Sequence, residues 1–445
     1  MEKFTLKDLI RMGRGIPVPL RLHIDTDSNS TDPEDQFAQE LVIEKIFRVL
    51  PRKRMVGLCE YEGRQAVAKI FFHSRHWERH LEREIRGNQL LIDAGQPVPQ
   101  IVETLRSESH TGGVLLTEFL VGSETLGDLW LNSMASDSDL LLISAALESI
   151  ASCHNQGLWQ EDIHLDNFLL FQEKIYLLDA GSIKVEVTND SLSQGKSLDN
   201  LALFFAQFPV WHDKNIEQLF SKYLKLRDCQ DWTVAEPGFI HMVKKARKKR
   251  LELYSRKLFR STSAHLFRQS IGQFLVADRK LRSSDFSAFV EDPDNCLQQG
   301  TVVKDGNSST VARVTINGHD YILKRYNIKG FLHGLKRLLR PSRAYKSWRA
   351  GHLLEMLGVG TAHPIMCLEQ RFFWIFRRRA YLLCEEISGE HLISDFESET
   401  RNLEQWGRVF ASFRNLFEIM KEYKISHGDM KATNFVYSGE QLYVL

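Results

Sequence analysis

The chain has 445 residues, which is enough for two or three domains at about 100–200 residues each. Its 43% hydrophobic and 26% charged residues are ordinary for a globular protein and exclude a wholly disordered or fibrous chain. Lys and Arg total 58 against 57 Asp and Glu, so no excess of positive charge attracts nucleic acid, and we expect no nucleic-acid partner.

The cysteines and the apolar segments bear on the compartment. The six cysteines are scattered, with no Cys-x-x-Cys pair and no cluster of Cys and His at metal-ligand spacing, which favours a reducing compartment. No run of about 18 or more apolar residues occurs, and the amino terminus lacks the apolar stretch of a secretory signal. We therefore expect a cytoplasmic protein, with peripheral attachment to a membrane left open.

The first elements suggest a small β-rich lobe. Residues 1–36 are predicted to form an amino-terminal arm that ends in the polar loop 26–34. A helix at 75–93 is closed by Gly95 and by the prolines beyond it. The predicted strands before and after this helix are 47–50, 55–61, 65–72 and 114–119.

The next segment is predicted to be mostly helical. A helix at 140–156 precedes two short strands, at 168–171 and 174–178. From there to about residue 281 the pattern indicates helices alone, including 197–207 and 243–259. The first domain is therefore predicted at 37–285.

Near residue 292 the pattern restarts, so the second domain is predicted at 286–445. The order of elements is that of the first domain, and a repeat one domain long is typical of gene duplication rather than of a solenoid. The predicted strands and helices are 301–304, 311–316, 319–325, 344–357, 381–387 and 403–423.

The first copy carries the residue types that phosphoryl transfer from ATP requires. Lys69, in Ala-Val-Ala-Lys on a predicted strand, could reach the phosphates. Glu84, on the following helix, could pair with Lys69, with Glu82 as a nearby competitor. Glu118, at the end of the strand 114–119, is predicted as a further contact of the cofactor.

Three more residues complete this set. Asp162 and Asn167 are five apart, the separation of the Asp and Asn of a kinase catalytic loop, so Asp162 is predicted as catalytic base. Asp179 follows an apolar strand and precedes Ala-Gly, as a second metal ligand should. Asn167 and Asp179 are predicted to bind Mg²⁺, a hard cation that favours oxygen ligands. Singly each match is weak, but together they predict a kinase-like domain.

The second copy repeats the set incompletely. Ser347 stands where Glu84 stands in the first copy, and the counterpart of Asp179 would be residue 446, so we expect a clipped chain whose second helical lobe is cut short. The loop 304–310 is suited to covering phosphates. The predicted residues of this copy are Asp429 as catalytic base, Asn434 as metal ligand, and Lys324, Ser308 and Ser309 at the cofactor.

These motifs suggest a family. The chain resembles the bacterial lipopolysaccharide kinase family, cytoplasmic enzymes that phosphorylate sugars, chiefly heptose, of the lipopolysaccharide inner core. His164, two residues after Asp162, matches small-molecule kinases of this type, whereas protein kinases have Lys there. The matching segments are Ala68–Phe71, Glu84–Pro99, Asp162–Phe168 and Leu178–Gly181 in the first copy, and Lys304–Val311, Arg340–Trp348 and His427–Phe435 in the second.

The resemblance implies an α+β fold of two tandem protein-kinase-like domains, each with a small β-rich N-lobe and a helical C-lobe. It further implies ATP and Mg²⁺ as cofactors, an anionic core glycolipid as acceptor, and contact with the inner-membrane surface through basic segments. One such segment, 324–349, has nine Lys or Arg, no acid, and leucines at roughly helical spacing. Two departures are the lack of a Gly-rich loop between Arg54 and Gln65, and Gln160 in place of the usual His.

Three functions stay open on the sequence. The first is a sugar kinase whose first copy is catalytic while the second binds substrate or regulates. The second is a catalytically inactive tandem pseudokinase that serves as scaffold or regulator of lipopolysaccharide core assembly. The third reverses the roles, with a catalytic second copy in a longer chain.

Overall fold

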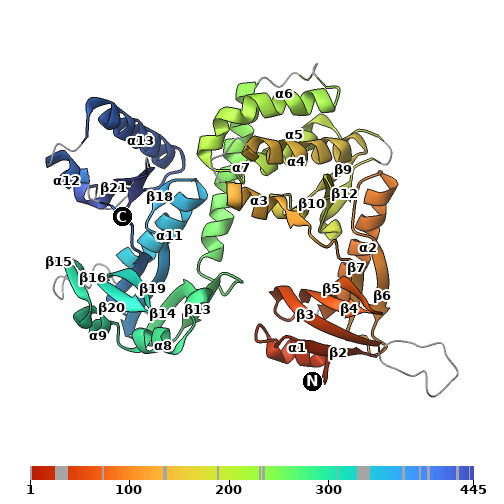
Figure 1. The fold of residues 1–445 in the computed structure, drawn as a ribbon, viewed down its shortest axis with the longest axis horizontal. Helices are drawn as coiled ribbons and strands as arrows, with labels where there is room; N and C mark the ends of the chain where they lie inside the picture. The colour runs from red at the N-terminus through yellow and green to blue at the C-terminus, as the bar shows by residue number, and fades with distance from the viewer. Residues whose placement is uncertain are drawn as a thin grey trace. The chain divides into compact units, whose positions relative to one another are not determined.

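The computed structural model describes most of the chain, and it divides the chain into two compact units. The first unit is Met1–Gln207 with Asn215–Val243, and the second is Phe208–Lys214 with Lys244–Leu445. Both mix helices and sheets, so the fold is α+β (Figure 1). The described residues are 3–25, 39–72, 75–133, 138–187, 190–229, 232, 236–307, 309–327, 341–372, 376–389, 392–397, 401–426, 430–439 and 441–445.

The first unit begins with a seven-stranded sheet. Its pairs are antiparallel except for the first two strands, which are parallel. In spatial order the strands are β1 (Lys3–Thr5), β2 (Leu20–Ile24), β3 (Gln39–Leu50), β4 (Arg54–Tyr61), β5 (Arg64–Phe72), β7 (Gly112–Glu118) and β6 (Ile101–Arg106).

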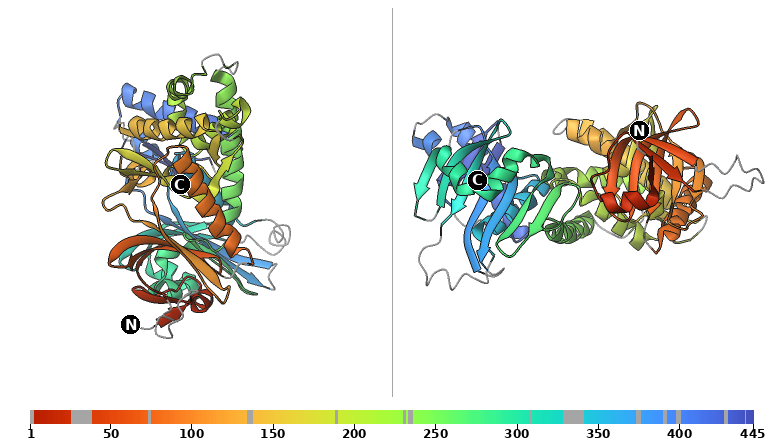
Figure 2. Two further views of the ribbon diagram at one scale, coloured as in Figure 1. Left: turned by 90° about the vertical axis from the view of Figure 1, so that its right-hand side faces the viewer. Right: turned by 90° about the horizontal axis from the view of Figure 1, so that it is seen from below.

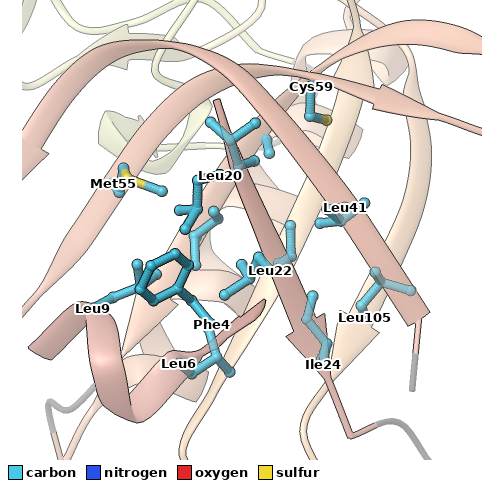
Figure 3. Close-up of a cluster of buried hydrophobic side chains, with 14 of the residues drawn as sticks. Phe4, Leu6, Leu9, Leu20, Leu22, Ile24, Leu41, Met55, Cys59 and Leu105 are labelled. Atoms are coloured by element: carbon cyan, nitrogen blue, oxygen red, sulfur yellow. The ribbon is translucent and has the colours of Figure 1, made fainter. Parts of the chain in front are cut away.

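The predicted amino-terminal arm 1–36 is wrong in its described part, because β1, α1 (Leu6–Met12) and β2 belong to this sheet and its core. Phe4, Leu9 and Leu22 are buried in one apolar cluster with residues of β3, β4 and β5 (Figure 3). The run LKDLI buries helically spaced side chains, and the run LRLHI buries alternate ones. Burial of these apolar side chains stabilises the packing of the segment on the sheet. The arm prediction rested on the polar loop alone.

Two helices cover opposite faces of the first sheet (Figure 2). Successive side chains of a strand point to opposite faces. Ala68 and Ile70 of β5 therefore join the cluster beneath α1, while Phe71 packs against Trp77 and Leu81 of α2 (Trp77–Asp93). Lys69 is two residues before Phe71, so its side chain is on the same face of the strand and points toward α2.

The remainder of the first unit is mainly helical, and two small sheets lie within it. The helices are α3 (Leu126–Ser133), α4 (Ser138–Asn155), α5 (Gln194–Phe205), α6 (Ile216–Leu226) and the start of α7 (Glu236–Lys257). The small sheets are β11–β10–β8, formed by Lys174–Leu177, Phe168–Phe171 and Glu124–Thr125, and β12–β9, formed by Ile183–Val185 and Leu158–Gln160.

The second unit also has a seven-stranded sheet. Helices α8 (Ser284–Glu291) and α9 (Pro293–Gln299) contribute to the core on one face, and α11 (Arg343–Met356) packs on the other. In spatial order the strands are β13 (His265–Gln269), β14 (Gln273–Asp278), β19 (Pro364–Phe372), β20 (Phe376–Glu385), β17 (His319–Tyr326), β16 (Ser309–Ile316) and β15 (Thr301–Gly306).

A smaller part of the second unit follows this sheet. It contains α12 (Leu392–Glu397), α13 (Leu403–Glu422) and the 3₁₀ turn η5 (Ala432–Asn434). A three-stranded sheet, β18 (Gly360–Thr361), β22 (Gln441–Val444) and β21 (Phe435–Ser438), packs with α13 around Leu416 and Phe435.

The two sheets share a five-stranded core. The order β3-β4-β5-β7-β6 in the first unit corresponds to β15-β16-β17-β20-β19 in the second. The register agrees as well, since Lys69 lies between Val56 and Leu115, and Lys324 between Val311 and Leu382. The repeat read from the sequence is thus also a repeat of topology.

The observed division differs from the predicted domains 37–285 and 286–445. The prediction of helices alone up to residue 281 is wrong, because β13 and β14 form a hairpin that adds to the second sheet. Val276 and Leu275 are buried in the two cores of that sheet. The hairpin and the second part of α7 therefore belong to the second unit.

Candidate active site

Lys69 and Glu84 form a partly buried ion pair in the first unit. The Lys69 Nζ lies 2.7 Å from Glu84 Oε2, and the Glu84 side chain is only 3% exposed. Period-two alternation along β5 directs Lys69 toward α2, and Glu84 faces the sheet from that helix. The predicted competitor, Glu82, is exposed and pairs with Arg106 instead.

Glu84 also contacts the backbone beyond Asp179. The Gly181 N–H donates to Glu84 Oε2 at 3.2 Å, and Arg83 donates to the Gly181 carbonyl at 3.0 Å. The chain approaches α2 closely here, because a Cβ on Gly87 would lie 1.8 Å from the Ala180 carbonyl oxygen. One carboxylate therefore joins β5, α2 and the 3₁₀ turn η2 (Ala180–Ser182).

Asp179 has an unusual backbone conformation, with φ 55° and ψ 51° in the left-handed region. A non-glycine residue seldom adopts it, and such residues concentrate at functional sites. Both the N–H and the hydroxyl of Ser182 donate to the Asp179 carbonyl, which holds the turn. The carboxylate is 28% exposed, so a ligand can reach it.

Asp162 and Asn167 are joined by a hydrogen bond. The Asn167 Nδ2 donates to the Asp162 carbonyl at 2.7 Å, and the side chain of Asn167 is buried. The amide oxygen of Asn167 is then the atom that could bind a metal ion. The Leu178 N–H donates to the Asn167 carbonyl, which brings Asp179 to the same loop. Asp162 has a 77% exposed carboxylate, and His164 lies 3.9 Å from it.

Gln160, which replaces the usual His, connects the strand β9 to the segment that carries Asp179. Its amide nitrogen donates to the Leu178 carbonyl at 2.8 Å, directly before Asp179. The Gln160 carbonyl accepts from Asn200, whose Oδ1 lies 3.1 Å from His154 Nε2. His154 Nδ1 contacts the Tyr223 hydroxyl at 2.7 Å. A buried polar network thus extends from α6 to the Leu178 carbonyl, next to the predicted metal ligand Asp179.

Burial dominates the acid–base behaviour of this network. Desolvation lowers the pKa of His154 to about 3 and raises the pKa of Tyr223 to about 12. Both groups are therefore neutral near pH 7. With Nε2–H donating to Asn200, His154 Nδ1 accepts from the Tyr223 hydroxyl.

Arg54 was missed by the sequence analysis, although it lies close to two predicted site residues. Its Nη1 is 3.6 Å from Glu84 Oε1 and 3.9 Å from Asp179 Oδ1. Arg54 follows the tight turn between β3 and β4, at the position of the second copy's 304–310 loop. Arg52 and Lys53 also lie in this turn, so three successive cations lead into the stretch after Arg54 in which a Gly-rich loop was sought. This run of three charges is the only feature of the sequence that could have indicated a role for Arg54.

A cationic pocket of about 500 Å³ lies beside η2 in the first unit. It is formed by the outer face of α2 and by β12, and its ionisable residues are four cations and one acid. They are Arg79, Arg83, Arg86, Lys184 and Glu82. Such a pocket suits an anion. Arg86 and Gly181 lie in two segments that resemble the family, but nothing in the sequence brings these segments together, which is why it did not reveal the pocket.

Other predicted residues have varied positions. Glu118 is exposed at the end of β7, and its N–H donates to the Gln100 carbonyl. In the second unit, Lys324 faces α11, where Ser347 Oγ lies 3.3 Å from the Tyr326 hydroxyl. Ser309 begins β16 opposite Tyr326. Asp429 and Ser308 lie outside the described residues.

Asn434 repeats the backbone geometry of Asn167. The Asn434 N–H donates to the Lys431 carbonyl as Asn167 does to His164, both at 2.9 Å. The Leu445 N–H donates to the Asn434 carbonyl at 3.0 Å, matching Leu178 and Asn167 at 2.8 Å. The repeat therefore extends to residue 445.

Comparison with known proteins adds no family. No protein-family model matches the chain, and no curated protein matches it either. Among the described residues, no helix is both long and apolar enough to cross a membrane.

Proposed function

We propose that the chain is an ATP-dependent phosphotransferase built from two tandem protein-kinase-like domains. The acceptor is a sugar, heptose by the sequence resemblance, of the lipopolysaccharide inner core at the cytoplasmic face of the inner membrane. The observation that carries the proposal is the contact of one buried carboxylate, Glu84, with both Lys69 and the Gly181 N–H. It links the phosphate-binding lysine to the metal-binding turn.

Each of the site residues of the first unit has a separate role in the proposed phosphoryl transfer. Lys69, held by Glu84, neutralises phosphate oxygens of ATP. Asp162, exposed at the loop, accepts the proton of the attacking hydroxyl. The carboxylate of Asp179 and the amide oxygen of Asn167 fit Mg²⁺, which neutralises charge on the transferred phosphoryl group when bound.

The cationic pocket beside η2 supports an anionic acceptor. Inner-core glycolipid carries negative charge, and Arg79, Arg86 and Lys184 line the pocket next to Gly181. The basic segment 324–349 is a second candidate contact with an anionic membrane surface. Its residues 328–340 lie outside the described part of the chain.

Transfer of labelled phosphate from ATP to purified core glycolipid tests the proposal. Asp162→Asn is expected to lower the turnover rate by about 10²–10⁴-fold through loss of the base. Glu84→Gln is expected to lower kcat/KM for ATP by about 10–100-fold, because a charge-assisted bond to Lys69 is lost. Glu78→Gln, an exposed carboxylate on the same helix, is the matched control and should have no effect.

The variant Asp429→Asn separates the two copies in the same assay. If Asp429→Asn silences transfer while Asp162→Asn does not, the second copy is the working one. If both variants retain full activity, or the wild type transfers no phosphate, the kinase proposal is refuted.

The inactive tandem pseudokinase is the second candidate, and Arg54 favours it. A guanidinium 3.9 Å from Asp179 Oδ1 already neutralises this proposed metal ligand. Titration calorimetry distinguishes the two, since a scaffold would show no heat of Mg²⁺-ATP binding, whereas the kinase would bind and Arg54→Ala would change the Mg²⁺ dependence.

A further inference from the structure

A cluster of histidines and carboxylates in the second unit contains none of the predicted site residues. His352 and Glu355 are on α11, three residues apart and so on one helix face. His363 directly precedes β19, and Asp278 ends β14. His265, the first residue of β13, lies beside them with its ring centroid 5.2 Å from that of His352.

The distances place three potential ligands around one point. His363 Nδ1 is 2.6 Å from Glu355 Oε1, and His352 Nδ1 is 3.3 Å from Glu355 Oε2. One ligand atom from each of these three residues lies within 4.8 Å of the others. On its other side, His363 Nε2 is 3.2 Å from Asp278 Oδ2.

Burial leaves part of this cluster unsatisfied. The His352 side chain is 2% exposed, and its Nε2 has no hydrogen-bond partner among the described residues. His352 Nδ1, the atom that faces Glu355, is the one available to a ligand shared with that carboxylate. The carboxylates of Asp278 and Glu355 flank the His363 ring on its two sides, and their negative charge attracts a divalent cation.

We propose that His352, Glu355 and His363 bind one divalent transition-metal ion, zinc by the chemistry of the ligands. Imidazole nitrogen with carboxylate oxygen is a ligand set that Zn²⁺ favours. Tetrahedral bonds of about 2.0–2.1 Å put ligand atoms about 3.3 Å apart, which the His352–Glu355 pair already matches. The two distances to Glu355 involve different oxygens, Oε2 for His352 and Oε1 for His363, so binding through one oxygen requires the carboxylate to rotate.

Asp278 has a positioning role in this site. With His363 Nδ1 on the metal, Nε2–H donates to Asp278, the arrangement in which a carboxylate orients a metal-bound histidine. Glu355 and His363 are 30% and 31% exposed, so the ion can enter from solvent and water can complete its coordination.

The site would fasten α11 to the hairpin that only the second sheet carries. His352 and Glu355 would bind the ion from the helix, and His363 would bind it from the start of β19. Asp278, at the end of β14, would orient His363. In the first copy, aligned as Ser347 aligns with Glu84, Gln89 and Ile92 replace the two helical ligands. The metal is therefore structural and specific to the second copy.

Metal titration of the full chain tests the proposal. The protein is stripped with a chelator, and binding of Zn²⁺ is followed by calorimetry and of Co²⁺ by its visible spectrum. We expect one ion per chain and a tetrahedral Co²⁺ spectrum. Asp278→Asn should weaken affinity by about 10–100-fold while keeping all three ligands. Glu355→Gln should abolish binding.

His319→Gln, an exposed histidine in the same unit, is the matched control and should bind as the wild type does. Circular dichroism reports whether each variant is folded; if Glu355→Gln is not, the Asp278→Asn affinity and the wild-type Co²⁺ spectrum decide. Absence of saturable binding of either ion to the wild type, or wild-type affinity in both Asp278→Asn and a folded Glu355→Gln, would overturn the proposal.

Discussion

His154 shows how a single side chain can make a folded unit sensitive to acid. The ring is 1% exposed and contacts Tyr223 on one side and Asn200 on the other. Its neutral form suits both contacts. Protonation would replace an acceptor by a donor at Nδ1, facing a hydroxyl that already accepts from Arg227.

The pH dependence of the first unit follows from this burial. Because the folded pKa of about 3 lies below the 6.5 of an ordinary exposed histidine, the unfolded chain binds a proton between these pH values that the folded chain does not. This contribution is present above about pH 6.5 and lost as pH falls toward 3. We expect the loss of stability from this group to reach about 3 kcal/mol at pH 4.

Urea unfolding at pH 7 and pH 4.5 measures this effect. His154→Gln keeps a donor and an acceptor, and we expect it to flatten the loss of stability between the two pH values. His110→Gln removes an 81% exposed histidine and should leave the loss unchanged. Equal losses in wild type and His154→Gln would show that other groups cause the acid sensitivity.

At the scale of elements, the position of α2 depends on a close approach. Gly87 faces η2 so tightly that a Cβ would meet the Ala180 carbonyl oxygen at 1.8 Å. Helix and turn therefore touch backbone to backbone, and this contact sets where Glu84 stands relative to Lys69 and Gly181.

Gly87→Ala is expected to destabilise the first unit by about 1–3 kcal/mol, despite the better helix propensity of Ala, because α2 must move away from η2. The displacement should also reduce phosphate transfer. Gly407→Ala on α13 is the control, since nothing lies within 4 Å of its added Cβ, and it should gain up to about 1 kcal/mol. A stabilised Gly87→Ala in a urea titration would contradict this account.

The elements that the sequence predicted well are those with a strong local signal. β10 coincides with its prediction, and α2 and α13 differ by two residues at most, since apolar period and stop signals define them. β13 and β14 were missed because His265–Asp278 is short and follows a long basic helix. Lys69 and Glu84 were paired correctly because a strand and the next helix commonly pack together.

Other features of the site lie beyond what the sequence can indicate. The contact of Glu84 with the Gly181 N–H depends on how a turn about 100 residues away packs on α2. The role of Gln160 was also hidden, because an amide can donate to a carbonyl in place of an imidazole only where geometry allows. The cationic pocket gathers residues from two distant segments.

At the scale of the molecule, the chain crosses between the units three times, into and out of the segment 208–214 and once within α7. Within the second unit, Arg247 of α7 connects the segment 208–214 to the end of α13. Arg247 donates to both oxygens of Asp213, at 2.8 and 2.6 Å, and to the Tyr423 hydroxyl at 2.9 Å. The side chain of Arg247 is 2% exposed and that of Asp213 is 19% exposed, so this charge pair is largely buried.

Arg247→Met should therefore destabilise the second unit by about 3–5 kcal/mol, because Asp213 is left largely buried without its cation. Hydrogen exchange should rise in α13 and η3 (Val210–Asn215) while β4 and β5 of the first unit stay protected, since each unit has its own core. Lys248 is on the same helix as Arg247 and forms an exposed pair with Glu422 of α13. The control variant Lys248→Met should therefore cost less than about 1 kcal/mol. Equal loss of protection in both units would mean that they unfold as one, and that α7 couples the two cores more strongly than their separate clusters indicate.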